Sequence, residues 1–240
     1  MQVGLATSCG KTSGGGNNND CNSNVDIQAL TLDGSGIAYG CLLVAGTMDV
    51  NVGPAITITG FAGIGISLDG SGAGYIHEAW LGQYPPGSAT PRQNATATAI
   101  SLGAKQHDCD VNNVIVWSGR VGVNSTNGAN RIQGVHTWNL MGKEGGFGIV
   151  LHHGVGRVQQ CYLDYAPLLL NIGSGQSPQG WFPAAVPSAV EGNLFLGSST
   201  IILKAATVKT PVSGLVITGM SAPPKGVLPH SAVRACSCRP

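Results

Sequence analysis

Two aspartates flank a cysteine in Asp108-Cys109-Asp110, directly after His107, and their type and spacing could support acid–base chemistry. A close pair of carboxylates can hold one proton up to a pH at which the protonated member acts as an acid. Aspartates at the entry to a turn also commonly bond their own backbone, so turn capping is the alternative role. We therefore treat Asp108 and Asp110 as candidate catalytic residues.

A third candidate acid is Asp164, which ends the short run Cys161-Tyr-Leu-Asp164. Turn capping is again the alternative. His136 could carry a proton near neutral pH, or it could be a hydrogen-bonded structural residue. His152 and His153 are alternatives for the proton carrier, and at most one of them faces a groove, because adjacent strand residues point to opposite faces.

Several basic, amide and aromatic side chains could hold an acidic sugar chain near these acids. Arg and Lys pair with carboxylates, although each could also be an ordinary solvated charge. The indole of Trp138 could stack on the face of a sugar ring. Trp117 is better explained by packing in the core or on the surface. The candidate substrate-binding residues are Arg120, Trp138, Asn139, Lys143, His152 and Lys204.

Short apolar runs, each followed by a turn and a second apolar run, must position these residues. The clearest examples are the pairs Asn113–Trp117 with Val121–Val123, Arg131–Val135 with Phe147–Leu151, and Arg157–Cys161 with Pro167–Leu170. The runs are too short for helices and are separated by glycine or polar residues, which is typical of strands joined by turns. The interval between successive units varies, from 18 residues (131 − 113) to 38 (113 − 75). This pattern predicts an all-β chain, a parallel β-helix with loops of unequal length.

Aligning the ends of these runs predicts two columns of side chains along the solenoid. Neighbouring strands lie about 4.8 Å apart, so each column would form a ladder beside a groove. The column after the second runs contains Asp69, Gly103, Ser125, His152, Asn171 and Lys204. The column after the first runs contains Gln83, Arg120, Asn139 and Tyr165, next to Trp138 and Asp164. Such ladders suit an extended sugar chain.

Composition agrees with an all-β chain and excludes some partners. Only 10% of the 240 residues are charged and 37 are glycine, which disfavours helices. The formal net charge is +1 and no Lys/Arg run occurs, so we expect no nucleic-acid partner. No apolar run is long enough to cross a bilayer, so we expect no membrane partner.

The seven cysteines occur without a paired CxxC spacing, so we expect no metal site. Cys9 and Cys21 are the best candidates for a loop-closing disulfide, whereas Cys41 and Cys161 could equally be buried free thiols.

The chain divides into three predicted parts. Residues 1–24 are rich in Gly and Asn and are expected to be flexible, 25–219 form the β-helix domain, and 220–240 form an irregular tail. A solenoid needs caps at its ends, so we expect the β-helix to be truncated at one or both ends. Met1 to Leu5 lack the features of a signal peptide, although two glycosylation sequons fit a secreted protein.

Five segments, in order, resemble the plant Quartet-type polygalacturonase-like proteins of the pectin-lyase-like group. They are Leu30-Thr-Leu-Asp-Gly34, Trp80-Leu-Gly-Gln83, Gly134-Val-His-Thr-Trp-Asn139, Gly145-Gly-Phe-Gly-Ile149 and Cys161-Tyr-Leu-Asp-Tyr165. The resemblance implies a right-handed parallel β-helix, secretion to the cell wall and hydrolysis of α-1,4-galacturonan in pectin. It also implies aspartates as acid and base of an inverting reaction, with no metal or organic cofactor. We further expect a monomer.

The broader glycoside hydrolase family 28 carries Asn-Thr-Asp, Asp-Asp, Gly-His-Gly and Arg-Ile-Lys motifs. The nearest matches here are Asp108-Cys-Asp110 and His152-His-Gly154, and Arg131-Ile-Gln133 precedes the histidines. The leading hypothesis is a polygalacturonase-like hydrolase. A calcium-dependent lyase would need clustered carboxylates and a basic residue. A non-catalytic wall-binding β-helix is the third hypothesis, which the incomplete motif set favours.

Overall fold

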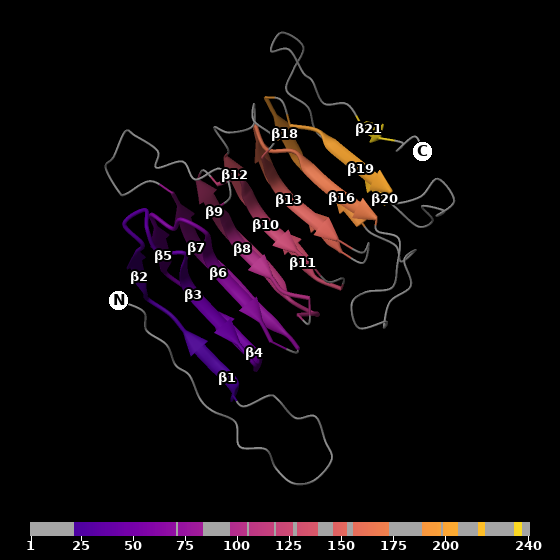
Figure 1. Cartoon of the computed structure of the whole chain (residues 1–240). Helices are drawn as coiled ribbons and strands as arrows, with labels where there is room; N and C mark the ends of the chain where they lie inside the picture. Colours follow the sequence, from indigo (N-terminus) through magenta and orange to yellow (C-terminus); the bar gives the residue numbers. More distant parts are fainter. Residues whose placement is uncertain are drawn as a thin grey trace.

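Short runs of β-branched and other apolar residues form β-strands throughout the described part of the chain. This computed structural model describes residues 22–70, 72–83, 97–104, 106–117, 119–126, 129–138, 146–152, 156–172, 189–197, 199–205, 216–218 and 233–236. Within these ranges the regular structure consists of strands alone, as Figure 1 shows. The prediction of an all-β chain is confirmed.

One sheet has 13 strands and divides into two arms. We call the longer row the main arm; it contains β1 (Asn22–Ile27), β4 (Thr47–Val52), β7 (Gly74–Gly82), β9 (Asp110–Trp117), β11 (Arg131–Gln133), β14 (Arg157–Gln159), β17 (Ala189–Glu191) and β20 (Val216–Thr218). The side arm contains β2 (Thr31–Asp33), β5 (Ile56–Thr59), the second halves of β7 and β9, β12 (His136–Trp138), β15 (Tyr162–Asp164) and β18 (Leu194–Leu196).

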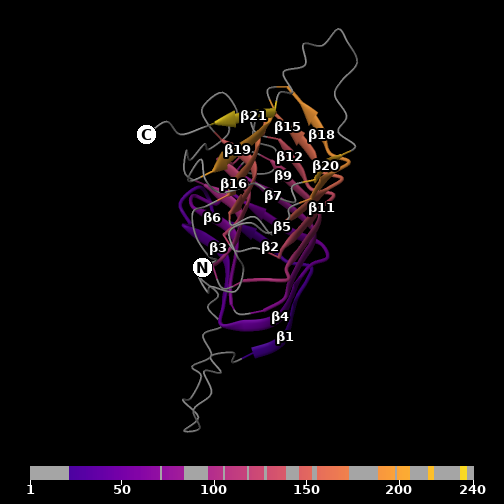
Figure 2. The ribbon, with the colours of Figure 1, turned by 90° about the vertical axis from the view of Figure 1, so that its right-hand side faces the viewer.

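The second sheet has eight strands. In chain order they are β3 (Gly40–Ala45), β6 (Ile64–Asp69), β8 (Thr98–Leu102), β10 (Val121–Ser125), β13 (Phe147–His152), β16 (Leu168–Ile172), β19 (Ile201–Ala205) and β21 (Val233–Cys236). Figure 2 shows this sheet facing the 13-stranded sheet across the molecule.

Every strand pair is parallel, and each strand pairs with the equivalent strand of the next coil. Arg131, for example, pairs with Asp110 on one side and with Arg157 on the other. The chain advances 21 residues (131 − 110) in one of these coils, whereas the coil from Tyr75 to Asp110 takes 35 (110 − 75). Parallel pairing with crossovers of unequal length is a parallel β-helix, which confirms the predicted fold. Its right-handed sense remains an expectation, consistent with the strong preference of parallel crossovers for that hand.

The core is a stack of inward side chains between the sheets. In the side arm, Leu32, Ile58, Leu81, Val116 and Leu163 occupy equivalent positions, and Ile58, Leu81 and Leu163 are completely buried. Burying one such side chain stabilises the fold by about 1.5–3 kcal/mol. Because side chains alternate along a strand, burial of this row fixes which residues of β12 and β15 face outward.

Five coils contribute three strands each rather than the two that the sequence pattern predicts, and in the coils of β7 and β9 the corner between the two arms lies within one long strand. The sequence pattern does not reveal the corner between the main-arm strand and the side-arm strand of a coil. In seven successive coils a single residue with positive φ turns the chain at this corner. These corner residues are Ala29, Ala55, Glu78, Asn113, Gly134, Gln160 and Gly192, with φ between 48° and 61°. A one-residue corner interrupts no apolar pattern, so the sequence gives no sign that β12 and β15 are separate from the strands before them.

Described strands also occur next to or beyond the two expected limits of the solenoid. Strand β1 begins at Asn22, and β21 pairs with β19 inside the segment that was expected to be an irregular tail. The proposed domain limits of 25 and 219 otherwise remain predictions. No helix among the described residues is long and apolar enough to span a membrane.

Candidate functional site

The outward side of the side arm brings together Asp164, His136 and Trp138, three residues singled out in the sequence. Strands β12 and β15 are paired so that His136 lies beside Tyr162 and Trp138 lies beside Asp164. Thr137 and Leu163, between them, are buried. The alternation therefore places His136, Trp138, Tyr162 and Asp164 on one outward surface.

Two tryptophans and an isoleucine of earlier coils continue this surface. Ile115 lies in register with His136, and Trp117 with Trp138, while Trp80 is in register with Ile115. We call the surface formed by Trp80, Ile115, Trp117, His136, Trp138, Tyr162 and Asp164 the aromatic face. Trp117 retains 37% of its accessible surface and Ile115 41%, so large apolar groups remain open to solvent. An exposed apolar patch rimmed by polar groups marks a binding surface.

The rings of the aromatic face contact one another from coil to coil. The Trp117 and Trp138 ring centroids lie 4.2 Å apart, and the His136 and Tyr162 rings are stacked at 4.3 Å. Gly82 is in register with Trp117, and the Trp80 ring lies over the Gly82 backbone. A Cβ on Gly82 would come within 2.5 Å of Trp80 Cη2. Ring contacts therefore join β9 to β12 and β12 to β15 across the face.

Asp164 is the acidic group of this face. Partial burial raises the pKa of its carboxyl above the ordinary value of 3.8, and the nearby His136 opposes that shift. Burial lowers the pKa of His136 below 6.5, with Asp164 opposing. Burial also raises the pKa of Tyr162, assisted by the negative charge of Asp164. The environment therefore favours the neutral acid and the neutral imidazole, a pair suited to proton transfer.

Strand register places Asp164 in a row that runs along the side arm through Trp138, Trp117, Gly82 and Thr59 to Asp33. Among the described residues of this row, Asp33 carries the one other carboxylate. Five strand spacings separate the two residues, roughly 24 Å. The acid and base of an inverting glycosidase are only about 6.5–9.5 Å apart. Asp33 is therefore too distant to act as the base for a reaction at Asp164.

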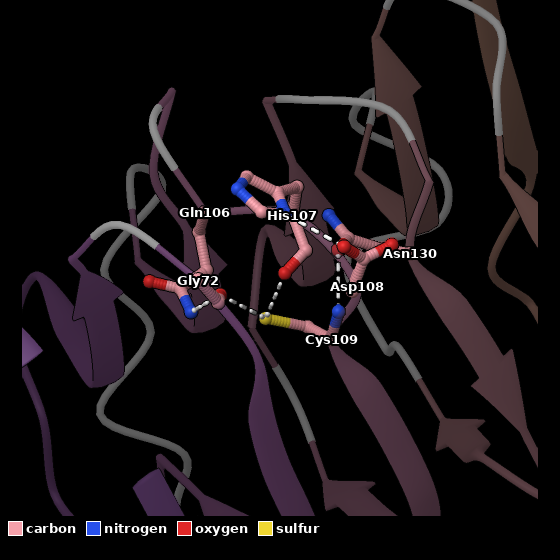
Figure 3. Close-up of polar contacts among 6 residues, drawn as sticks. All are labelled: Gly72, Gln106, His107, Asp108, Cys109 and Asn130. Atoms are coloured by element: carbon pink, nitrogen blue, oxygen red, sulfur yellow. Dashed lines mark hydrogen bonds and ion pairs between the residues drawn. The ribbon is translucent and has the colours of Figure 1, made fainter. Parts of the chain in front are cut away.

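Asp108 lies at a different corner, before β9, as Figure 3 shows. Its carboxylate is 2.7 Å from His107 Nδ1, and its side chain is 67% exposed. The neighbouring Cys109 is buried; its N–H donates to Asn130 Oδ1 (2.9 Å), and its Sγ donates weakly to the Gly72 carbonyl (3.9 Å). Burial raises the Cys109 pKa to about 12, so this thiol is unreactive.

Asp110 points outward from the main arm and forms an ion pair with Arg131 of the next coil. Its side chain is only 13% exposed, whereas that of Arg131 is 50% exposed. The two members of the Asp108–Asp110 pair therefore have different partners, His107 and Arg131, and neither belongs to the aromatic face.

His152 and Lys204 lie on the eight-stranded sheet. His152 is in register with Asn171, which is in register with Lys204, so these three members of the predicted column are neighbours. His152 Nε2 lies 3.2 Å from Asn124 Oδ1, and its Nδ1 lies 3.0 Å from Asn171 Nδ2. Ser125 was wrongly assigned to this column, because its register partners are the buried Leu102 and Leu151 and it points into the core.

The other predicted site residues are distributed as follows. Arg120 is exposed before β10, and its carbonyl accepts a bond from the Phe147 N–H (2.7 Å). Gln83 is buried and donates to the Phe61 carbonyl (3.3 Å), which excludes it from a groove-lining ladder. Asn139, Lys143 and His153 lie outside the described residues, as do Cys9 and Cys21.

Sequence reasoning missed Tyr162 and a set of glutamines on the main arm. Tyr162 carries a sequence signal, because it lies two residues before Asp164 and shares its face. Cys41, Cys109 and Cys161 are free thiols. In the described ranges, no group of three or more His, Cys, Asp or Glu side chains is placed to hold a metal ion.

Comparison with known proteins reveals a distant homologue. Over 134 residues, or 54% of this chain, the sequence is 31% identical to polygalacturonase QRT3 of Arabidopsis thaliana. The match covers 25% of that protein, so it spans about a quarter of the relative's length. The resemblance to polygalacturonase-like proteins is thereby confirmed as distant homology. No family model matches the chain, and no solved structure matches it significantly.

Proposed function

We propose that this chain acts on pectic polysaccharide as a secreted, polygalacturonase-like hydrolase of α-1,4-galacturonan in the cell wall, with Asp164 as the proton donor. The distant homology to polygalacturonase QRT3 supports the class of reaction. The observation that carries the proposed site is the pairing of Asp164 with Trp138 on the aromatic face.

The substrate would lie along the axis of the solenoid, across β9, β12 and β15. Sugar rings present apolar faces that can pack on Trp117 and Trp138, and their hydroxyl groups remain free to bond polar neighbours. A chain held in this way passes directly over the Asp164 carboxyl. Binding on rigid strands rather than on a loop would fix the glycosidic oxygen relative to the acid.

Asp164 would protonate the leaving oxygen as the glycosidic bond breaks. The partial burial that raises its pKa keeps a larger fraction of the carboxyl protonated than in water, which is the requirement for a general acid. His136, on the adjacent strand, would orient the carboxyl and respond to its change of charge. Hydrolysis also needs a carboxylate that activates water.

Asp108 and Asp110 were the sequence candidates for this second role, but they lie before and at the start of β9, whereas Trp117, at its other end, lies in the Asp164 row. Roughly 23 Å of strand separates Asp110 from Trp117, so both aspartates fail the distance criterion that excludes Asp33. Asp110 is already engaged by Arg131, and Asp108 by His107. The substrate carboxylates would need cations, for which Arg120, Lys143 and Lys204 are the candidates, together with Asn139 and His152 as polar contacts.

A non-catalytic pectin-binding β-helix is the second candidate function. The observation that favours it is the single nearby carboxylate on the described part of the aromatic face, since hydrolysis needs two. Such a protein would use the same tryptophans for binding and would leave the polysaccharide intact.

The reaction class is tested by incubating the chain with polygalacturonate, with and without a chelator. Reducing ends and the absorbance of unsaturated products are measured together. The hydrolase predicts reducing ends without unsaturated products, unaffected by the chelator. Unsaturated products that disappear on chelation would identify a lyase, and retention on pectin without product would identify the binding protein.

A further inference from the structure

A pocket on the main arm, separate from the aromatic face, is lined by three glutamines, a glutamate and a glycine. Its volume is about 240 Å³, and its lining residues are Gln133, Gln159, Gln160, Glu191 and Gly192. The lining belongs to three successive coils, at the ends of β11, β14 and β17 and the corners that follow them.

Strand register and corner glycines create this pocket. Gln133, Gln159 and Glu191 are paired in register and therefore project in one row. At the next position, the three corners hold Gly134, Gln160 and Gly192, so only the middle corner carries a side chain. A Cβ at Gly192 would meet nothing closer than Gln160 Cγ, at 3.8 Å, which shows that open space surrounds this corner.

The polar groups around the space already form a pre-organised network. Gln133 Nε2 donates to Gln160 Oε1 (3.1 Å), and Gln159 Nε2 donates to Glu191 Oε2 (2.7 Å). An amide nitrogen carries two hydrogens and its carbonyl oxygen two lone pairs. Each of these bonds therefore uses only part of the capacity of the groups that make it, and every glutamine retains hydrogen-bonding capacity toward a ligand.

We infer that this pocket is a binding site for one ring of a neutral saccharide. Adjacent amides that both donate and accept match the vicinal hydroxyls of a sugar, each of which is also a donor and an acceptor. The lining carries one negative charge, that of Glu191, and no positive charge, so an acidic sugar would be repelled. The volume lies below the range of roughly 300–1,000 Å³ that holds drug-sized ligands, which suits a single ring.

This site is independent of the proposed hydrolysis. It lies on a different arm of the sheet, it contains no tryptophan, and its charge disfavours galacturonan. Its ligand class is a polysaccharide built of neutral sugars, held at one ring while the rest of the polymer extends into solvent.

Affinity electrophoresis of the whole chain tests the inference. Native gels contain soluble galactan, arabinan, dextran or polygalacturonate in turn, and retardation gives the affinity. We expect retardation by at least one of the neutral polymers. Absence of retardation by all three would overturn the inference, and so would a polygalacturonate affinity that depends on the pocket residues.

Two variants and one matched control assign the retardation to the pocket. Gln160→Gly removes an amide at a corner with φ 52°, which glycine adopts without strain, and should weaken neutral-polymer binding roughly 2- to 10-fold. Gln159→Ala removes an amide and also leaves Glu191 without its donor, so it should weaken neutral-polymer binding by about 10-fold or more. The control Asn113→Gly changes the same corner position (φ 51°) in a coil outside the pocket and should have no effect.

Binding of neutral polymers at the pocket can be distinguished from binding of polygalacturonate at the aromatic face. Trp138→Ala should leave neutral-polymer retardation unchanged. If Gln160→Gly and Gln159→Ala both bind the neutral polymer as the unaltered chain does, the pocket is not its site and the inference is wrong.

Discussion

Trp138 and Asp164 are paired in register on β12 and β15, so an indole and a carboxyl project side by side from neighbouring coils. The residues that precede them, Thr137 and Leu163, are buried in the core and hold the two strands in this register. A slip of one residue would bury the acid and expose the core, so the packing of the solenoid maintains the site.

Removing the indole should weaken polysaccharide binding without unfolding the chain. Trp138→Ala deletes a ring that packs on Trp117 at 4.2 Å and that would stack on the substrate. We expect roughly 2- to 10-fold weaker retention on polygalacturonate, the equivalent of one aromatic contact. Tyr75→Ala, an exposed ring on the main arm, is the control and should retain full binding. Equal losses in the two variants would contradict a specific aromatic face.

The shifted groups of the aromatic face predict how stability depends on pH. The folded pKa of Asp164 is raised above 3.8, so its contribution is present below that pH and is lost as the pH rises through the folded pKa. The folded pKa of His136 is lowered below 6.5, so its contribution is present above pH 6.5 and is lost as the pH falls through the folded value.

Urea midpoints of the variants between pH 3 and pH 8 test these two signs. Asp164→Asn should be more stable than the unaltered chain at neutral pH and should lose that advantage toward pH 3. His136→Gln should resist the loss of stability below pH 6.5. A midpoint of Asp164→Asn below that of the unaltered chain at pH 7 would show that ionised Asp164 is stabilised in the fold, contrary to the expected shift.

The ion pair of the main arm predicts a structural role for Arg131. Arg131→Ala leaves the mostly buried Asp110 carboxylate without its cation, and Asp110 Oδ1 already has no partner among the described residues. We expect a loss of about 1–3 kcal/mol in the free energy of unfolding. Arg157→Ala, the exposed register neighbour, should cost less than about 0.5 kcal/mol. Similar urea midpoints for both variants would refute the distinction.

Thr137 offers a stabilising substitution beneath the face. Its Oγ1 is buried and has no hydrogen-bond partner in the described part of the chain. Thr137→Val replaces the hydroxyl by a methyl of similar size and should raise the free energy of unfolding by about 1 kcal/mol, measured by urea denaturation. Binding to polygalacturonate should not change, because Thr137 points inward. A lowered urea midpoint would indicate that the hydroxyl is satisfied in solution.

The fold follows from the sequence because its signal is local. Runs such as Ile56–Thr59 coincide with a strand of the structure, and their polar alternation identifies the buried side. The corner between the two arms is not visible in the same way. It needs one residue with positive φ, and Asn113 and Gln160 occupy it as readily as Gly134, so composition carries no consistent mark of it.

The candidate site was predictable only in part for the same reason. Asp164, His136 and Trp138 lie near the ends of readable runs, and strand register brings them together. The glutamine pocket depends on which residues of three coils share a register, and coil lengths from 21 to 35 residues conceal that alignment in the sequence. Ser125 was misplaced by one position, which in a strand reverses the side chain from the surface to the core.

The most direct test of the account is the rate of reducing-end release from polygalacturonate by the unaltered chain and by Asp164→Asn, with Asp108→Asn as the comparison. If Asp164 is the general acid, its substitution should lower the rate by about 100-fold or more while retention on the polymer persists. Asp108 lies outside the aromatic face, so Asp108→Asn should lower the rate less. Hydrolysis by Asp164→Asn at the rate of the unaltered chain would contradict the central claim that the aromatic face is the active site.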